Sequence, residues 1–303
     1  MKSKLIVIAG STASGKTSLS VELAQQLNCP IISADSRQFY KELSIGTAKP
    51  TDEEMGGVKH YFIDSHSIKS PLSAGQFEKE ALLLLENLFK KHEHIILVGG
   101  SGMFIKALVE GTNQLPHDVE VQKKWNDFYE VNGLSFLQNE LKKIDPDHHD
   151  KIDINNPVRI IRALEIIEIT GKKIADLTAK EKTKRNFITY YFVIDHPRNK
   201  LYNRINNRVE QMFENGLLDE VKDLEKHKHL QPLNTVGYKE LFDYYDGKIS
   251  LEEAKAAIKK NTRRYAKRQL TWFRAVPDAI FLEYCSNDKM SKFILQTIAT
   301  DLS

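Results

Sequence analysis

Residues 4–17 read Lys4-Leu5-Ile6-Val7-Ile8-Ala9-Gly10-Ser11-Thr12-Ala13-Ser14-Gly15-Lys16-Thr17. The apolar, β-branched run at the start is typical of a buried strand in a parallel sheet. The last eight residues fit the pattern G-x-x-x-x-G-K-[ST] and stand between this strand and a predicted helix at residues 17–27, the context that the motif requires. In such a loop the backbone N–H groups cradle phosphate oxygens, Lys16 adds a charge and the Thr17 hydroxyl binds Mg²⁺. We therefore expect residues 10–17 to bind a di- or triphosphate, and the alternative is a chance glycine turn.

Strands and helices alternate over the first 110 residues, which predicts a doubly wound α/β domain with a parallel sheet. The further strand-like runs of this part are residues 31–35, 60–64 and 95–99, with helical patterns such as residues 76–91 between them. From residue 113 to 184 the apolar spacing is helical only. Strand-like runs return at residues 188–194 and 279–283, on either side of helices between residues 197 and 274. The sequence thus predicts a P-loop core of residues 1–112 and 186–303, whose C-terminal part is helical, and a helical insertion domain of residues 113–185.

The composition is that of a globular protein. The chain has 303 residues, of which 41% are hydrophobic and 28% charged, so disorder and a disulfide scaffold are disfavoured. No apolar run approaches the roughly 20 residues that span a bilayer. The N-terminus reads as a strand and not as a signal peptide. Cys29 and Cys285 stand far apart and cannot build a zinc finger. We expect a cytoplasmic monomer that does not bind membranes.

The positive charge is concentrated in one stretch. Residues 151–274 carry 26 basic and 17 acidic side chains, an excess of nine, although the whole chain carries only +3. Residues 254–277 contain no acidic residue, and Arg263, Arg264, Lys267 and Arg268 are interleaved there with aromatic residues. This composition favours a polyanionic partner such as RNA, and a solvated helix face is the alternative.

Asp35 follows the second predicted strand, at the edge of the sheet where α/β proteins bind ligands. Three roles are compatible with this position: a metal ligand, a general base and a helix cap. Asp64 follows the next strand in a comparable way. The pair His148 and His149, flanked by aspartates, suggests a metal site, but an exposed turn is the commoner use of such residues.

Several blocks of the sequence closely resemble the tRNA dimethylallyltransferases, also called tRNA isopentenyltransferases. The resemblance begins in the loop of residues 10–17 and continues through most of the chain in the order of that family. Its most specific blocks are Ser33-Ala34-Asp35-Ser36-Arg37-Gln38-Phe39-Tyr40, Ile45-Gly46-Thr47-Ala48-Lys49-Pro50, Val98-Gly99-Gly100-Ser101-Gly102-Met103-Phe104, Gly216-Leu217-Leu218-Asp219-Glu220-Val221 and Lys267-Arg268-Gln269-Leu270-Thr271-Trp272.

The resemblance implies transfer of a dimethylallyl group from its diphosphate to the exocyclic amine of the adenosine immediately 3′ of the anticodon in tRNA. On this interpretation the loop binds the diphosphate leaving group and no ATP is hydrolysed. Asp35 is then the base that accepts the amine proton, while Lys16, Arg208 and Mg²⁺ neutralise the diphosphate. Ser101 stands where the family usually has threonine, and its hydroxyl is expected to bind the bridging oxygen of the leaving group.

The resemblance also implies which residues contact the tRNA anticodon stem-loop. The adenine must leave the base stack to reach Asp35, and the amide of Gln38 is suited to read its edge. The expected tRNA contacts are Asp35, Ser36, Arg37, Gln38, Ser101, Lys123, Arg159, Arg162, Arg263, Arg264, Lys267 and Arg268.

Two other functions remain open from the residues alone, and a third is disfavoured. A P-loop small-molecule kinase would use Asp35 to hold Mg²⁺ or to deprotonate a hydroxyl. A nucleotide-dependent switch would need a guanine-reading N-K-x-D stretch, which the sequence lacks. Prenyl transfer to free adenine nucleotides is the closest alternative, and the basic stretch favours tRNA over it.

Overall fold

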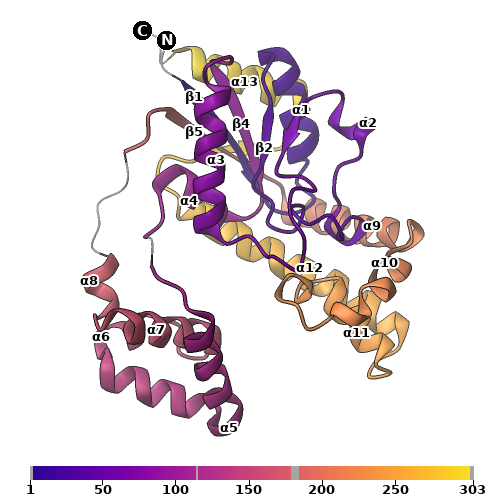
Figure 1. The fold of residues 1–303 in the computed structure, drawn as a ribbon. Helices are drawn as coiled ribbons and strands as arrows, with labels where there is room; N and C mark the ends of the chain where they lie inside the picture. The colour runs from indigo at the N-terminus through magenta and orange to yellow at the C-terminus, as the bar shows by residue number, and fades with distance from the viewer. Residues whose placement is uncertain (1–2, 114, 179–183, 301–303) are drawn as a thin grey trace. The chain divides into compact units, whose positions relative to one another are not determined.

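The computed structural model describes residues 3–113, 115–178 and 184–300. Its centre is a six-stranded sheet in which every neighbouring pair of strands is parallel (Figure 1). The strands are β1 (Lys4–Gly10), β2 (Ile31–Ser33), β3 (His60–Tyr61), β4 (His94–Gly99), β5 (Ile188–Asp195) and β6 (Ile280–Glu283). Their order across the sheet is β3-β2-β4-β1-β5-β6. The predicted doubly wound α/β fold is thereby confirmed.

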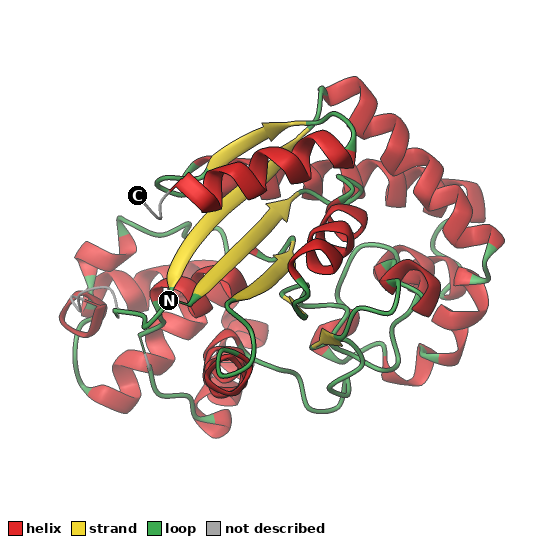
Figure 2. Cartoon of the chain, turned by 90° about the horizontal axis from the view of Figure 1, so that it is seen from above, coloured by secondary structure: helices red, strands yellow, loops and turns green. Residues whose placement is uncertain are grey.

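β1 is buried throughout and apolar after Lys4, because helices cover both faces of the sheet (Figure 2). Alternate residues of a strand point to opposite faces. Leu5 and Val7 belong to one hydrophobic cluster, with α3 (Ala74–Leu88) and α4 (Gly102–Glu110). Ile6 and Ile8 belong to the other, with α1 (Lys16–Leu27) and α13 (Asn287–Thr300).

The neighbouring strands β1 and β4 send their following helices to opposite faces of the sheet. α1 follows β1 and packs in one cluster, whereas α4 follows β4 and packs in the other. The loops that leave the two strands therefore diverge, and open α/β sheets bind their ligands in the crevice formed at such a point. The phosphate-binding motif of residues 10–17 and Ser101 both lie there.

The helices between β5 and β6 pack around a further hydrophobic cluster, to which Tyr40, Leu43 and Ile68 also contribute. These helices are α9 (Arg198–Glu214), α10 (Leu217–Asp223), α11 (Tyr238–Tyr245) and α12 (Leu251–Arg274), with short 3-10 turns η2 (Glu225–His227) and η3 (Gln231–Leu233). Gly216 precedes α10 with a φ of 95°, and Gly237 precedes α11 with a φ of 100°. Because these left-handed conformations favour glycine, they separate the helices at fixed positions.

The chain divides into two compact units, residues 1–110 with 184–303 and residues 111–183. The sequence predicted an insertion of residues 113–185, and β5 and β6 do join the sheet of β1. The second unit holds α5 (Val119–Ile144), α6 (Pro146–His149), α7 (Pro157–Thr170) and α8 (Ile174–Thr178) around its own hydrophobic core. α5 is interrupted at Gly133, whose φ is 75°.

Two strands are shorter than predicted, which affects the site. β2 ends at Ser33, so Asp35 lies in the following turn. β3 ends at Tyr61 because Phe62 and Asp64 have positive φ angles of 63° and 52°, which no strand accommodates. Between β2 and β3 lie η1 (Ile45–Thr47) and α2 (Asp52–Met55).

Within the described part of the chain, no helix combines the length and the apolar character that a membrane span requires.

Candidate active site

The phosphate-binding loop closes tightly over the end of β1. A Cβ atom on Gly10 would lie 2.9 Å from Ser14 Oγ and 3.1 Å from the carbonyl oxygen of Ile194. Gly15, at the start of α1, has a φ of 92°. Both glycines are therefore required by the local geometry, the first for close backbone approach and the second for the turn into the helix.

Three cationic side chains are anchored on this loop. Lys16 Nζ donates to the carbonyl oxygen of Ser11 at 2.7 Å. From α9, Arg204 Nε donates to the carbonyl oxygen of Ala13 at 2.7 Å, and Arg208 Nη1 lies 3.4 Å from Thr12 Oγ1. The helix α9 thus places two arginines, one turn apart, beside the predicted phosphate site.

A cavity of about 590 Å³ opens beside the loop. Its lining includes Thr12, Ala13, Ser14, Gly15, Lys16, Thr17, Asp35, Gln38, Arg204 and Arg208. Burial lowers the pKa of Lys16 to about 8, an effect that Asp35 opposes and Arg208 reinforces. The structure thereby brings the predicted base, the predicted loop and the predicted cations to one cavity.

Asp35 is held in a turn whose backbone it caps. Its Oδ1 accepts the N–H of Arg37 at 3.2 Å, and its carbonyl oxygen accepts the N–H of Gln38 at 3.1 Å. Within the described residues, no backbone N–H of this turn donates to the second carboxylate oxygen. Asp64, the other aspartate after a strand, is paired with Lys49. The structure thus distinguishes two aspartates that their position after a strand does not distinguish.

The amide of Gln38 has a fixed orientation. Its Nε2 lies 3.3 Å from the carbonyl oxygen of Thr47 and 3.1 Å from that of Ala48. Only the NH₂ end of an amide can donate to two carbonyls, so the assignment of nitrogen and oxygen follows from these partners. The acceptor oxygen Oε1 is therefore the end available to a ligand in the cavity.

Ser101 joins the turn after β4 to the turn after β2. Its Oγ accepts the N–H of Ser36 at 3.0 Å and donates to Ser36 Oγ, also at 3.0 Å. The serine hydroxyl that the sequence placed near the leaving group is thus oriented by the residue that follows Asp35. The side chain of Arg37 lines a smaller cavity nearby, of about 100 Å³.

The basic residues of α12 divide between two faces. Arg264, Lys267 and Arg268 are exposed and line a shallow groove of about 450 Å³ together with Thr271 and Trp272. Arg263 instead donates from Nη1 to Asn206 Oδ1 on α9 at 2.7 Å and lies over the ring of Tyr202. Three of the four predicted contacts therefore face solvent together, and the fourth ties two helices to each other.

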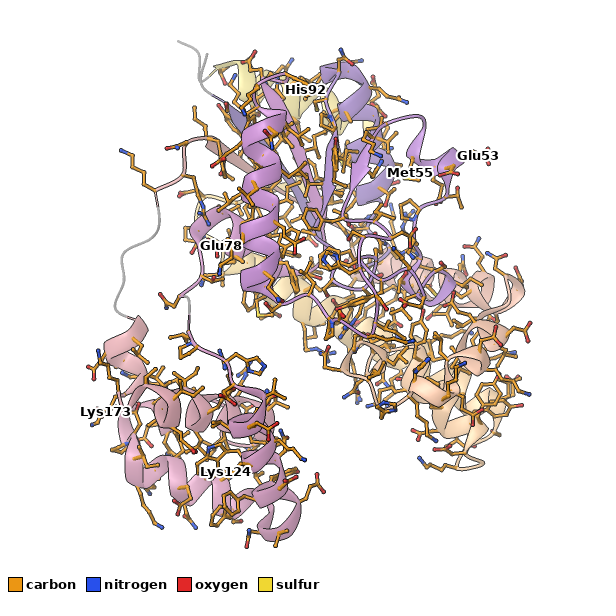
Figure 3. The ribbon with its side chains drawn as sticks, viewed as in Figure 1. Glu53, Met55, Glu78, His92, Lys124 and Lys173 are labelled. Carbon is orange, nitrogen blue, oxygen red and sulfur yellow. The ribbon has the colours of Figure 1, made fainter. Side chains whose placement is uncertain are left out.

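In the second unit, Arg159 and Lys123 are exposed, as a phosphate contact requires. Lys124, the neighbour of Lys123 on α5 (Figure 3), is paired with Glu168 at 2.7 Å. Arg162 lies 2.7 Å from Glu165, a fully buried carboxylate. Burial tends to raise the pKa of Glu165, but hydrogen bonds from Arg162, Asp118 and His117 lower it below its usual value. Arg162 is thus part of an internal network.

A model of the IPP transferase family matches residues 38–276. The chain belongs to this family. It is 47% identical over 290 residues to the tRNA dimethylallyltransferase of Christiangramia forsetii, with 95% of this chain and 96% of the relative covered. These comparisons confirm the resemblance found in the sequence motifs.

Solved structures agree with this assignment. A tRNA isopentenylpyrophosphate transferase from Bacillus halodurans matches with a TM-score of 0.74 and 39% identity, covering 99% of this chain and 97% of its own. A eukaryotic dimethylallyltransferase, described as acting on tRNA, matches with a TM-score of 0.77 and 29% identity. That match covers 93% of this chain and 74% of the eukaryotic one.

Two residues of this IPP transferase family member contact the site although the sequence did not predict them. Arg204 stands four residues before Arg208, so helical spacing would have indicated that both face the loop. Gln269 comes from α12, and its amide bonds to the loop and to the turn after β4. Only its presence in the family block of residues 267–272 pointed to it, because its partners lie far away in the sequence.

The cavity also fits a magnesium ion bound together with diphosphate. Thr17 lines it and offers a hydroxyl oxygen, a hard ligand of the kind that Mg²⁺ prefers, beside phosphate oxygens and water. In the described ranges, no three His, Cys, Asp or Glu side chains gather as a metal site. His148 and His149, which suggested such a site, end the short helix α6 instead of forming the expected turn.

Proposed function

We propose that this protein transfers the dimethylallyl group of dimethylallyl diphosphate to the exocyclic amine of the adenosine immediately 3′ of the anticodon in tRNA, with release of diphosphate. The observation that carries this proposal is the cavity in which Asp35 faces a phosphate-binding loop with Lys16 and Arg208. A family member needs both an anion site and a base for this reaction, and the cavity holds both.

The diphosphate binds to the loop and to the three cations around it. Lys16, Arg204 and Arg208 are already anchored on the loop, so little rearrangement is needed when the anion arrives. As the allylic C–O bond breaks, negative charge grows on the diphosphate. Cations held in a partly buried cavity stabilise that charge more than they would in water.

The amine of adenine attacks the allylic carbon and must lose one proton. Asp35 lines the same cavity and accepts this proton, so that the product amine is neutral. The Gln38 Oε1 atom accepts a hydrogen bond from the edge of the adenine, because its NH₂ group is occupied by Thr47 and Ala48. This arrangement favours a base that presents an N–H group there.

Ser101 and Thr17 act on the leaving group. To donate to the bridging oxygen, the Ser101 hydroxyl turns away from Ser36 Oγ, its partner in this structure. Thr17 would hold Mg²⁺ together with the diphosphate. When bound, the ion supplies additional charge neutralisation for the diphosphate oxygens.

The tRNA phosphates bind to exposed cations. On α12 these are Arg264, Lys267 and Arg268, which share one groove. In the second unit they are Lys123 and Arg159. Cations of this kind give affinity that does not depend on sequence. We further expect a cytoplasmic monomer, as predicted from the sequence.

One experiment tests the proposal. The protein is incubated with dimethylallyl diphosphate or with ATP, each with unmodified tRNA, with AMP or alone, and the products are identified by mass. We expect a tRNA heavier by one dimethylallyl group only when dimethylallyl diphosphate and tRNA are both present. Prenylated AMP would favour transfer to free nucleotides, and a phosphorylated product would favour a kinase.

A further inference from the structure

The loops after β1 and β4 diverge from neighbouring strands, and one side chain connects them. Gln269 lies on α12 and is only 7% exposed. Its Oε1 accepts the N–H of Thr12 at 2.9 Å, and its Nε2 donates to the carbonyl oxygen of Gly100 at 2.9 Å. A single amide therefore satisfies one backbone group on each side of the crevice in which the substrates react.

Both partners of Gln269 stand beside residues of the proposed mechanism. Thr12 belongs to the phosphate-binding loop, and its hydroxyl faces Arg208. Gly100 precedes Ser101, and a Cβ atom at Gly100 would lie 2.4 Å from Gln269 Nε2. A substitution at residue 269 therefore shifts the phosphate-binding loop, the Ser101 turn or both. Because the diphosphate contacts both elements in the proposed mechanism, the distance between them must stay constant.

We propose that Gln269 is a positioning residue, which locks the phosphate-binding loop and the Ser101 turn into the geometry that binds and releases diphosphate. The amide is chemically suited to this role because one end accepts a hydrogen bond and the other donates one. The N–H of Thr12 is accordingly a structural donor to Gln269. The N–H of Ser14 donates to the carbonyl oxygen of Ser11 within the loop at 3.3 Å. The other N–H groups of a loop of this kind are the ones that bind phosphate.

This inference rests on the proposed function, and two substitutions test it. Gln269→Met keeps the length of the side chain and removes both hydrogen bonds. Gln269→Glu keeps the acceptor for Thr12, but its carboxylate turns a second acceptor towards the carbonyl oxygen of Gly100. A protonated carboxylic acid again has one donor and one acceptor, so low pH restores the pair of hydrogen bonds in this variant only.

The expected results are specific to positioning. We expect Gln269→Met to lower kcat for transfer by about 10- to 100-fold, the usual cost of a misplaced reacting group, with tRNA affinity changed less than twofold. The activity of Gln269→Glu, divided by that of the wild type, should rise as the pH falls, whereas the same ratio for Gln269→Met should stay constant. Asp35, Arg37 and Arg208 are the charged groups that line the adjoining cavity. Taking the ratio removes any dependence on pH that the variant shares with the wild type.

Gln296→Glu serves as the matched control, because Gln296 is exposed on α13 and the change in charge is identical. Wild-type kinetics in Gln269→Met would overturn the inference. So would a Gln269→Glu variant whose activity relative to the wild type does not respond to pH. A melting temperature for each variant shows whether the fold has been lost, and binding of inorganic pyrophosphate is then compared among the variants that melt normally.

The pyrophosphate measurement separates this inference from the proposed function, since it requires no turnover. We expect Gln269→Met to bind inorganic pyrophosphate about tenfold more weakly, the loss of roughly one positioned hydrogen bond. If the wild type binds pyrophosphate but transfers no dimethylallyl group, the proposed function fails. If Gln269→Met binds pyrophosphate as tightly as the wild type, the positioning role fails.

Discussion

The affinity for dimethylallyl diphosphate should fall steeply above pH 8, because of Lys16. Burial lowers the pKa of this lysine to about 8 in the free protein, so the group loses its proton in an accessible range of pH. A bound diphosphate favours the charged form and raises the pKa in the complex. Above pH 8, binding therefore takes up a proton, and affinity decreases as the pH rises.

The size of the effect follows from the charged fraction of Lys16. With a pKa of about 8, this fraction falls from about 0.9 at pH 7 to about 0.03 at pH 9.5, so we expect Kd to rise about 30-fold. The terminal phosphate of the ligand ionises near pH 6, below this window. Titration calorimetry without tRNA measures Kd directly, since no transfer occurs.

Lys16→Arg is the matched control for this measurement, because a guanidinium stays protonated over the whole range. The Kd of this variant should change little between pH 7 and pH 9.5, whatever its absolute value. A wild-type Kd that is independent of pH would refute the reasoning. An equally steep rise in Lys16→Arg would show that another group titrates.

Three further predictions concern the base, the groove and the second unit. Asp35→Asn should slow single-turnover transfer by about 100-fold or more, with tRNA and donor affinities near those of the wild type; near-normal turnover would exclude Asp35 as the base. Replacing Arg264 and Lys267 by Ala should reduce the slope of the logarithm of the tRNA binding constant against the logarithm of salt concentration by about two. The control, Arg263→Ala, should lower the melting temperature and keep the slope. Equal slopes in the double variant and the wild type would show that the groove makes no phosphate contacts. Glu165→Ala should destabilise the second unit by about 1–3 kcal/mol, because the N–H of Asp118 loses its acceptor and Arg162, whose side chain is 35% exposed, loses its ion-pair partner; chemical denaturation of the full chain measures this, and an unchanged transition would contradict it.

The local parts of the site were predictable from the sequence. The phosphate-binding loop is defined by contacts within eight residues, so its spacing alone indicated the fold of residues 10–17. The same holds for β1, whose continuous apolar run requires burial on both faces. Asp35 could be placed at the ligand-binding edge, although its strand ends two residues earlier than expected.

The remaining parts depend on contacts between distant residues, which spacing cannot supply. Gln269 meets Thr12 across 257 residues of sequence, and Arg204 meets Ala13 across 191. The difference between Arg263 and Arg264 has the same origin. They are adjacent in a basic stretch, but a helix turns successive residues by about 100°, so one faces α9 and the other faces solvent. Composition indicated that the helix is basic, and only packing indicates which cations reach solvent.

The way in which the cations are held explains how an anion site can exist before its ligand arrives. Lys16, Arg204 and Arg208 would repel one another if they faced an empty cavity without partners. Instead, two of them donate to carbonyl oxygens of the phosphate-binding loop, and the third lies beside a loop hydroxyl. The loop thus presents carbonyl and hydroxyl oxygens to the cations. A diphosphate that enters meets cations already placed, so little of its binding energy is used to order side chains. Preorganisation of this kind favours the state in which charge on the leaving group is greatest, because the cations have no need to move as that charge grows.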